Sequence, residues 1–163
     1  MSKDKKKQIG VLGLIIVLIA VLTGGVLFVG AVSGWFDDPK VVLETEYYKS
    51  DQTGFLELSK SKYEELIQSK KSFVVFIDQG GCTTADRLRE YTQDYMEEKG
   101  ILVYRMMFND MKGTSLHDQV KYYPSVVIVD KGSVRGYLRA DNDEDADIYN
   151  NYEEFKSWMN RFL

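Results

Sequence analysis

The chain has 163 residues, a formal net charge of −4, one cysteine and one histidine. This length suits one domain of ordinary size beside a short additional segment. A single cysteine excludes an internal disulfide. With one histidine and no further ligands at metal-binding spacing, we expect neither a metal site nor a bound cofactor.

The first 32 residues have the pattern of a membrane anchor. Residues 1–8 carry a net charge of +3, and residues 9–32 contain no charged side chain. A helix of this length reaches roughly 36 Å, enough to cross a hydrocarbon core of roughly 30 Å. We therefore expect a basic cytoplasmic tail at 1–8 and a transmembrane helix at 9–32, with the rest of the chain outside the cytoplasmic membrane. A cleaved secretory signal is the alternative, because Ala31–Ser33 fits a small-residue cleavage site.

The remaining residues, 33–163, carry a net charge of −7, because residues 9–32 are uncharged. An acidic domain is a poor partner for nucleic acid, so we expect its partner to be an extracytoplasmic protein or peptide chain. Residues 33–54 are expected to form a tether, within which Val41–Leu43 can form a short strand or a packed extension. The regular patterns of a folded domain begin at Phe55 and continue to Leu163.

The domain at 55–163 alternates strands and helices. Apolar periodicity, capping residues and turn residues predict the following elements in chain order: a strand at 55–58, a helix to about 70, a strand at 72–78, a helix at about 83–99 closed by Gly100, a strand at 101–108, a loop with a short helix at 109–123, a hairpin of strands at 125–130 and 133–139, an acidic loop at 141–147, and a last helix that Asn151 can cap. This order predicts an α/β fold with a central mixed sheet flanked by helices.

Cys82 follows the apolar strand at 72–78 and precedes the helix expected from Thr83. Unpaired N–H groups and the helix dipole at such a position favour the thiolate, the reactive form of cysteine. The alternative is an inert thiol, since free cysteine is often simply buried. The glycine-containing turn at 79–81 argues against deep burial.

The element order, the position of Cys82 and the sequence Tyr122–Ser125 before the late hairpin resemble the thioredoxin family over residues 55–163. The resemblance implies a thioredoxin-like fold in which Cys82 is the attacking nucleophile and Pro124 is cis and faces it. It also implies that an extended substrate chain is bound around the thiol by Pro124, Tyr123, Gly81 and Thr83.

Several positions depart from the pattern of the family. Gly81 stands where the family usually has Trp, Thr83–Thr84 replace Gly-Pro, and Ala85 replaces the resolving cysteine. Phe76 occupies the place of a buried acid, and Asp78 is near it without matching its position. These changes exclude the usual intramolecular dithiol cycle, because a single thiol that forms a mixed disulfide needs another thiol to resolve it.

Two functions follow from these observations. The first is a membrane-anchored monothiol protein for thiol-disulfide exchange, which the retained Cys82 favours. The second is a redox-inactive thioredoxin-fold module that binds or positions an exported or cell-surface protein, like the accessory proteins of bacterial export systems. Ala85, Gly81 and Phe76 favour the second function.

Two further features have simpler explanations than a site. His117 is expected at the surface rather than over the thiol. The alternating acids of 141–147 resemble a calcium loop, but Ala146 stands where glycine is needed and Tyr152 where the twelfth-position Glu would be. We expect a solvated loop that leads into a helix N-terminus.

Overall fold

The structure is a computed structural model that describes residues 39–48 and 54–163. The expected tail at 1–8 and transmembrane helix at 9–32 lie outside these residues. Within the described part of the chain, no helix combines the length and the apolar character needed to cross a membrane. The unit described below runs from Lys40 to Leu163.

Five strands form one sheet in the order β1-β3-β2-β4-β5. Their bounds are Leu56–Glu57 for β1, Phe73–Asp78 for β2, Tyr104–Met107 for β3, Ser125–Asp130 for β4 and Ser133–Tyr137 for β5. The first three pair in parallel, whereas β4 is antiparallel to both β2 and β5. The expected mixed sheet with a late hairpin is therefore confirmed, and β2 is its central strand.

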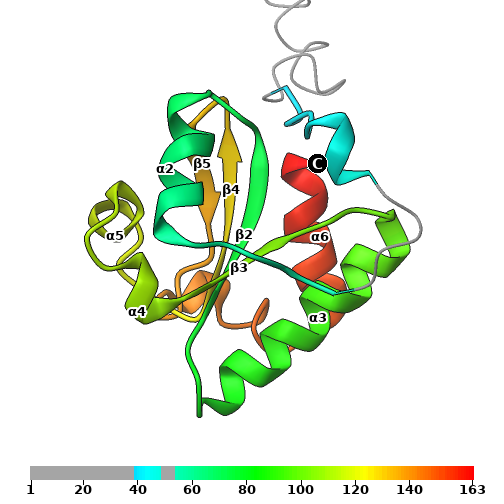
Figure 1. Cartoon of the computed structure of the whole chain (residues 1–163). Coiled ribbons are helices and arrows are strands. Elements are labelled where there is room, and N and C mark those ends of the chain that lie inside the picture. The colour runs from blue at the N-terminus through cyan, green and yellow to red at the C-terminus, as the bar shows by residue number, and fades with distance from the viewer. Residues whose placement is uncertain (1–38, 49–53) are drawn as a thin grey trace, which may run out of the picture. The chain divides into compact units, whose positions relative to one another are not determined.

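Helices cover both faces of this sheet. Figure 1 shows α2, α4 and α5 on one side and α3 and α6 on the other. Their bounds are Lys60–Gln68 for α2, Thr83–Lys99 for α3, Phe108–Met111 for α4, Ser115–Gln119 for α5 and Tyr152–Phe162 for α6, with 3₁₀ turns η1 at Thr45–Tyr47 and η2 at Asp143–Asp145. The fold is thus a mixed α/β sheet flanked by helices.

All six residues of β2 are buried, because successive side chains point to opposite faces and helices cover both faces. Phe73 contacts the ring of Tyr63 in α2 at a centroid distance of 6.4 Å. Phe76 points to the other face and stacks on Phe55 at 5.5 Å. The buried apolar run that marks this strand in the sequence therefore forms the centre of the core.

The ends of two helices illustrate how local residues set the elements. Asn151 caps α6, since its side chain accepts hydrogen bonds from the N–H groups of Glu153 and Glu154. Gly100 ends α3 in the left-handed conformation, with φ +62°, which glycine adopts without a steric penalty. Both caps agree with the sequence prediction.

The N-terminal segment Lys40–Tyr48, within the expected tether, packs against the domain, in agreement with the packed extension considered for Val41–Leu43. Val41 and Leu43 are buried and Val42 is 76% exposed, the alternation of an extended chain lying on a surface. The Val41 N–H donates to the Phe162 carbonyl at 2.6 Å, and the Leu102 N–H donates to the Tyr47 carbonyl at 2.8 Å. Apolar burial and backbone hydrogen bonds thus fix this segment to the unit.

Candidate functional site

The candidate site lies at the end of the sheet where β2 finishes and β4 begins. In the sheet register Ile77 pairs with Ser125, and Asp78 pairs with Met107 at the end of β3. Cys82 follows β2 after a short turn, and Pro124 directly precedes β4. Because β2 and β4 are antiparallel, the segments that contain Cys82 and Pro124 lie at the same end of the sheet.

Cys82 is the N-cap residue of α3 and is partly exposed. Its backbone is extended, and its carbonyl accepts a hydrogen bond from the Asp86 N–H at 3.1 Å. The Cys82 side chain makes no capping hydrogen bond to the first turn of α3. A helix N-terminus leaves N–H groups without intrahelical partners and favours negative charge. The thiol therefore stands beside unpaired donors and is accessible to another molecule.

The residues on either side of Cys82 are exposed. Gly81 has φ +75°, and a Cβ atom built on it would meet nothing within 4 Å. The backbone conformation, rather than a lack of space, therefore favours glycine at position 81. Thr83, the first residue of α3, is also exposed. Both predicted contact residues are thus available to a partner chain.

Ala85, three residues after Cys82, has a fully buried side chain. Phe76 in β2 is also fully buried and stacks on Phe55 in the core. Near Cys82, neither position supplies a group that could accept a proton or close an intramolecular disulfide.

The peptide bond between Tyr123 and Pro124 is cis, the conformation that the family resemblance implies. Pro124 is buried, and its carbonyl accepts a hydrogen bond of 2.8 Å from the hydroxyl of buried Tyr149. Burial raises the pKa of Tyr149 above its ordinary value, so its hydroxyl keeps the proton that it donates. That Pro124 faces Cys82 directly stays a prediction.

Tyr123 belongs to an aromatic cluster beside the start of β4. Its ring stacks on Phe108 of α4 with centroids 3.9 Å apart. The ring of His117 lies 6.3 Å from that of Phe108. His117 is half-buried within this cluster, rather than fully exposed. Tyr123 therefore presents a ring that is held in place by its own neighbours.

An ion pair between Asp78 and Arg89 was missed in the sequence. The buried Asp78 carboxylate, at the end of β2, receives hydrogen bonds from Arg89 Nη2 at 2.9 and 3.1 Å and from Nε at 3.3 Å. Asp78 raises the pKa of Arg89 through these bonds. The Nη1 atom of Arg105 lies 3.9 Å from Asp78 Oδ2. The sequence offers one indication of this ion pair: Asp78 is a charged residue in an otherwise apolar, buried strand, and a buried charge requires a partner.

The acidic loop makes contacts within the protein. The Asp145 carboxylate accepts a hydrogen bond from the Arg139 N–H at 2.8 Å, and Asp141 lies 3.8 Å from the Arg139 guanidinium. Among the residues that the structure describes, no group of three or more His, Cys, Asp or Glu side chains could hold a metal ion.

Solved thioredoxins are similar to this chain in structure. The reduced thioredoxin pre-protein of Schistosoma mansoni has a TM-score of 0.51 and 13% identity, with 68% of this chain and 100% of that chain covered. The oxidised thioredoxin of Plasmodium falciparum has a TM-score of 0.46 and 13% identity, covering 63% and 98% respectively. No protein-family model and no curated protein matches the sequence. The first comparison confirms the thioredoxin-like fold.

Proposed function

We propose that this thioredoxin-like protein exchanges disulfides through one thiol, that of Cys82. The observation that supports this most is the placement of a partly exposed thiol, free of capping bonds, at the N-terminus of α3. Strand β2, which precedes Cys82, finishes at the same end of the sheet at which β4 begins after cis Pro124. In this proposal, a partner polypeptide in an extended conformation binds near the start of β4, next to the Cys82 thiol.

The chemistry requires an external thiol. The Cys82 thiolate attacks one sulfur of a partner disulfide, which forms a mixed disulfide and releases the other sulfur as a thiolate. A small-molecule thiol then attacks Cys82 Sγ and releases the partner as its second thiolate. A second small-molecule thiol frees Cys82. In the whole cycle the partner disulfide is reduced and two external thiols are oxidised to one disulfide.

The partner chain would lie across the residues around the thiol. Gly81 and Thr83 are exposed on either side of Cys82, and Tyr123 adds a ring stacked on Phe108. Pro124 is buried, so in this proposal it shapes the start of β4 while its neighbours make most of the contact.

A redox-inactive binding module is the second candidate. Ala85 offers no resolving sulfur, and the one carboxylate at the end of β2, that of Asp78, is held by Arg89. A surface that has lost these groups can still hold an exported or cell-surface protein. The two candidates thus share a binding surface and differ in the role of Cys82.

The sequence supports an extracytoplasmic location for this domain. In our proposal, residues 9–32 anchor the chain in the cytoplasmic membrane, with the basic tail 1–8 on the cytoplasmic side. The partner would then be a protein or peptide chain outside that membrane.

Trapping of mixed disulfides on intact cells tests the proposal. Rapid alkylation should preserve adducts of the wild-type chain that migrate separately under non-reducing conditions and vanish on reduction. Cys82→Ser should abolish all of them. Partner capture that survives Cys82→Ser would instead support the binding module.

Ala85→Cys provides a second variant for the same experiment. A thiol at this position could attack Cys82 Sγ within the chain, because its Cys-x-x-Cys spacing is that of dithiol sites. The proposal predicts several-fold fewer trapped adducts in this variant than in the wild type. Adducts of unchanged amount, in a variant whose unfolding curve matches the wild type, would contradict a mixed disulfide at Cys82 Sγ.

A further inference from the structure

A pocket lies at the opposite end of α3 from Cys82. It has a volume of about 150 Å³ and is lined by Leu43, Tyr48, Tyr95, Lys99, Ile101, Asn160 and Leu163. We call it the distal pocket. The 17 residues of α3 separate its two ends by about 25 Å, so this pocket is remote from the thiol.

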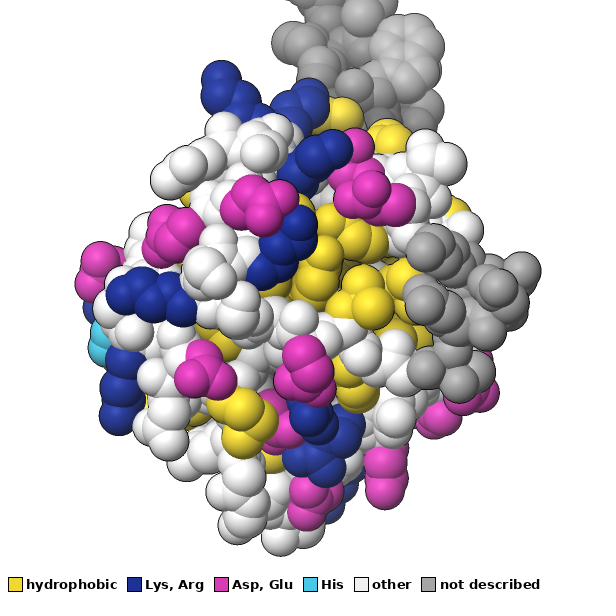
Figure 2. Space-filling view, in the orientation of Figure 1, with side chains coloured by type: hydrophobic (Ala, Val, Ile, Leu, Met, Phe, Trp, Pro, Cys, Tyr) yellow, Lys and Arg dark blue, Asp and Glu magenta, His cyan; other side chains and the backbone are white. Residues whose placement is uncertain are grey.

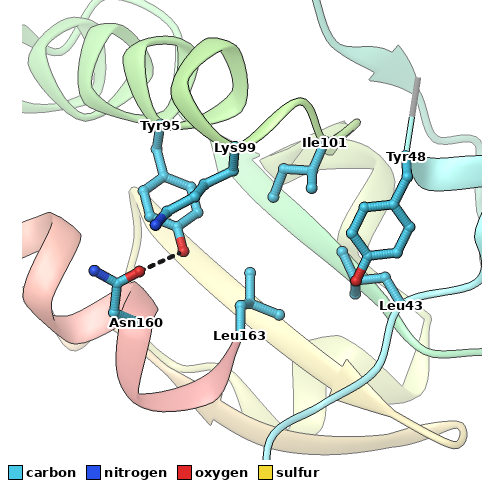
Figure 3. Close-up of a pocket in the computed structure, with 7 residues that line it drawn as sticks. All are labelled: Leu43, Tyr48, Tyr95, Lys99, Ile101, Asn160 and Leu163. Carbon is cyan, nitrogen blue, oxygen red and sulfur yellow. Dashed lines mark hydrogen bonds between the residues drawn. The ribbon is translucent and has the colours of Figure 1, made fainter. Parts of the chain in front are cut away.

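Three parts of the chain meet at the distal pocket. Figure 3 shows Tyr95 and Lys99 on the last turns of α3, Asn160 and Leu163 at the end of α6, and Leu43 and Tyr48 on the N-terminal segment. The Tyr95 hydroxyl donates a hydrogen bond to Asn160 Oδ1 at 3.1 Å, which joins α3 to α6. This hydrogen bond between α3 and α6 holds two walls of the pocket together in the absence of a ligand.

The lining is mostly apolar. Leu43, Ile101 and Leu163 contribute aliphatic side chains, and the two tyrosines contribute rings. The face shown in Figure 2 exposes hydrophobic side chains among acidic and basic ones. Of the residues that line the pocket, Tyr48 is 50% exposed, whereas Leu43, Tyr95 and Ile101 are buried. A mostly apolar concave lining with a few polar groups is typical of a binding pocket.

Lys99 is the charged residue among those that line the pocket. Lys99 extends over the Tyr95 ring, with its ammonium 5.6 Å from the ring centre. Among the described residues, Glu98 lies 3.7 Å from this ammonium but makes a shorter contact of 2.6 Å with Lys156. The bond to Lys156 holds the pKa of Glu98 below its ordinary value. Glu98 is thus engaged by Lys156, which leaves the Lys99 ammonium only loosely paired.

We propose that the distal pocket binds one apolar side chain of a partner polypeptide and that Lys99 pairs with a carboxylate next to it. A cavity of about 150 Å³ accepts a group the size of benzene, which corresponds to the side chain of Phe or Leu. The positive rim on an otherwise acidic domain selects acidic residues on either side of that anchor. This interaction does not involve Cys82 and is independent of the proposed redox function.

The experiment uses the full chain in detergent micelles with labelled Leu and Ile methyl groups. The probe is the acetylated, amidated peptide Gly-Glu-Phe-Glu-Gly, titrated while NMR shifts are recorded. Saturable shifts at Leu43, Ile101 and Leu163 are expected. Peptides with Ala in place of Phe, or Lys in place of both Glu, should bind at least about tenfold more weakly. Equal binding of all three peptides, or shifts elsewhere only, would overturn the proposal.

Variants separate the pocket from general charge effects. Lys99→Glu should weaken binding of the acidic peptide about tenfold, whereas Lys60→Glu, an exposed change on α2, should leave it unaltered. Leu163→Trp keeps the rim charge and fills the pocket, so it should also abolish the saturable shifts. Cys82→Ser should bind as the wild type does. Equal weakening by both lysine variants would reject the assignment.

Discussion

The two ends of α3 differ in what builds them. At the N-terminal end, Cys82 is the N-cap residue, Gly81 directly precedes it, and the buried Ala85 lies in the first turn of the helix. At the C-terminal end, Tyr95 and Lys99 form a pocket together with a chain segment that precedes the first strand. The first end is built around one thiol by residues that are adjacent in the chain. The second end forms a pocket because residues that are far apart in the chain pack together there.

This difference teaches that fold and chemistry are specified separately. The position of Cys82 depends on β2, α3 and β4, which many side chains stabilise together, whereas dithiol chemistry depends on single residues. An alanine at position 85 is therefore compatible with this architecture. The distal pocket depends instead on the N-terminal segment, so changes there should affect folding and binding together.

The largest effect on stability is expected from truncation of Leu43, a buried residue of the N-terminal segment Lys40–Tyr48. Leu43→Ala should reduce the free energy of unfolding by about 2–5 kcal/mol, because Leu43 is 3% exposed and its loss leaves a cavity. Val42→Ala, at a neighbour that is 76% exposed, should change it by less than about 0.5 kcal/mol. Urea unfolding of the full chain measures both. Equal effects of the two variants would show that the segment does not stabilise the unit.

An intermediate effect is expected at the other end of α3. Arg89→Ala leaves the buried Asp78 carboxylate with Arg105 at 3.9 Å, and should cost about 2 kcal/mol. Asp86→Asn removes only the 61% exposed partner of Arg89 and should cost less than about 0.5 kcal/mol. The comparison by urea unfolding at pH 7 shows which ion pair holds α3 on β2. A larger loss for Asp86→Asn would reverse the assignment.

The smallest effect is a pH dependence at the distal pocket. Burial raises the pKa of Tyr95 to about 12, against about 10 for an unfolded tyrosine. The buried phenol favours its neutral form, so its contribution to stability is complete below pH 10 and is lost as the pH rises towards 12. Tyr95→Phe should cost about 1 kcal/mol at pH 8, through the lost bond to Asn160, and less near pH 12.

Urea unfolding at several pH values between 8 and 12 measures how the stability difference between Tyr95→Phe and the wild type falls with pH. Asn160→Ala is the matched control, since it removes the same hydrogen bond and keeps the phenol. The stability difference between Asn160→Ala and the wild type should fall less than that of Tyr95→Phe, because the buried phenol still ionises in this variant. A constant difference for Tyr95→Phe would show that the ionisation of Tyr95 does not affect folding.

Much of the fold could be predicted because local patterns agree with the tertiary structure. The apolar run of β2, the left-handed Gly100 and the cap at Asn151 are each encoded by a few adjacent residues. The start of α2 is less clear from the sequence, because Ser59 and Ser61 both have side chains that can cap a helix. In the structure, Ser59 accepts the capping hydrogen bond, from the Lys62 N–H. Two serines two positions apart offer the same chemistry, and only the direction of the incoming chain selects one.

The candidate site could be predicted in part. The positions of Cys82 and Pro124 followed from the resemblance, because both lie at element boundaries that the sequence marks. The pairing of Asp78 with Arg89 did not follow, since it joins a strand end to a helix in a direction that sequence spacing does not define.

The sequence by itself determined the α/β order, the single thiol at the start of a helix and the absence of a second cysteine. These depend on residue identity and on interactions between near neighbours. Only the tertiary structure decided that Ala85 is buried, that Asp78 is neutralised, and that Leu43 and Leu163 line one pocket. These properties depend on contacts between residues far apart in the chain, and burial and charge pairing exist only once those contacts have formed.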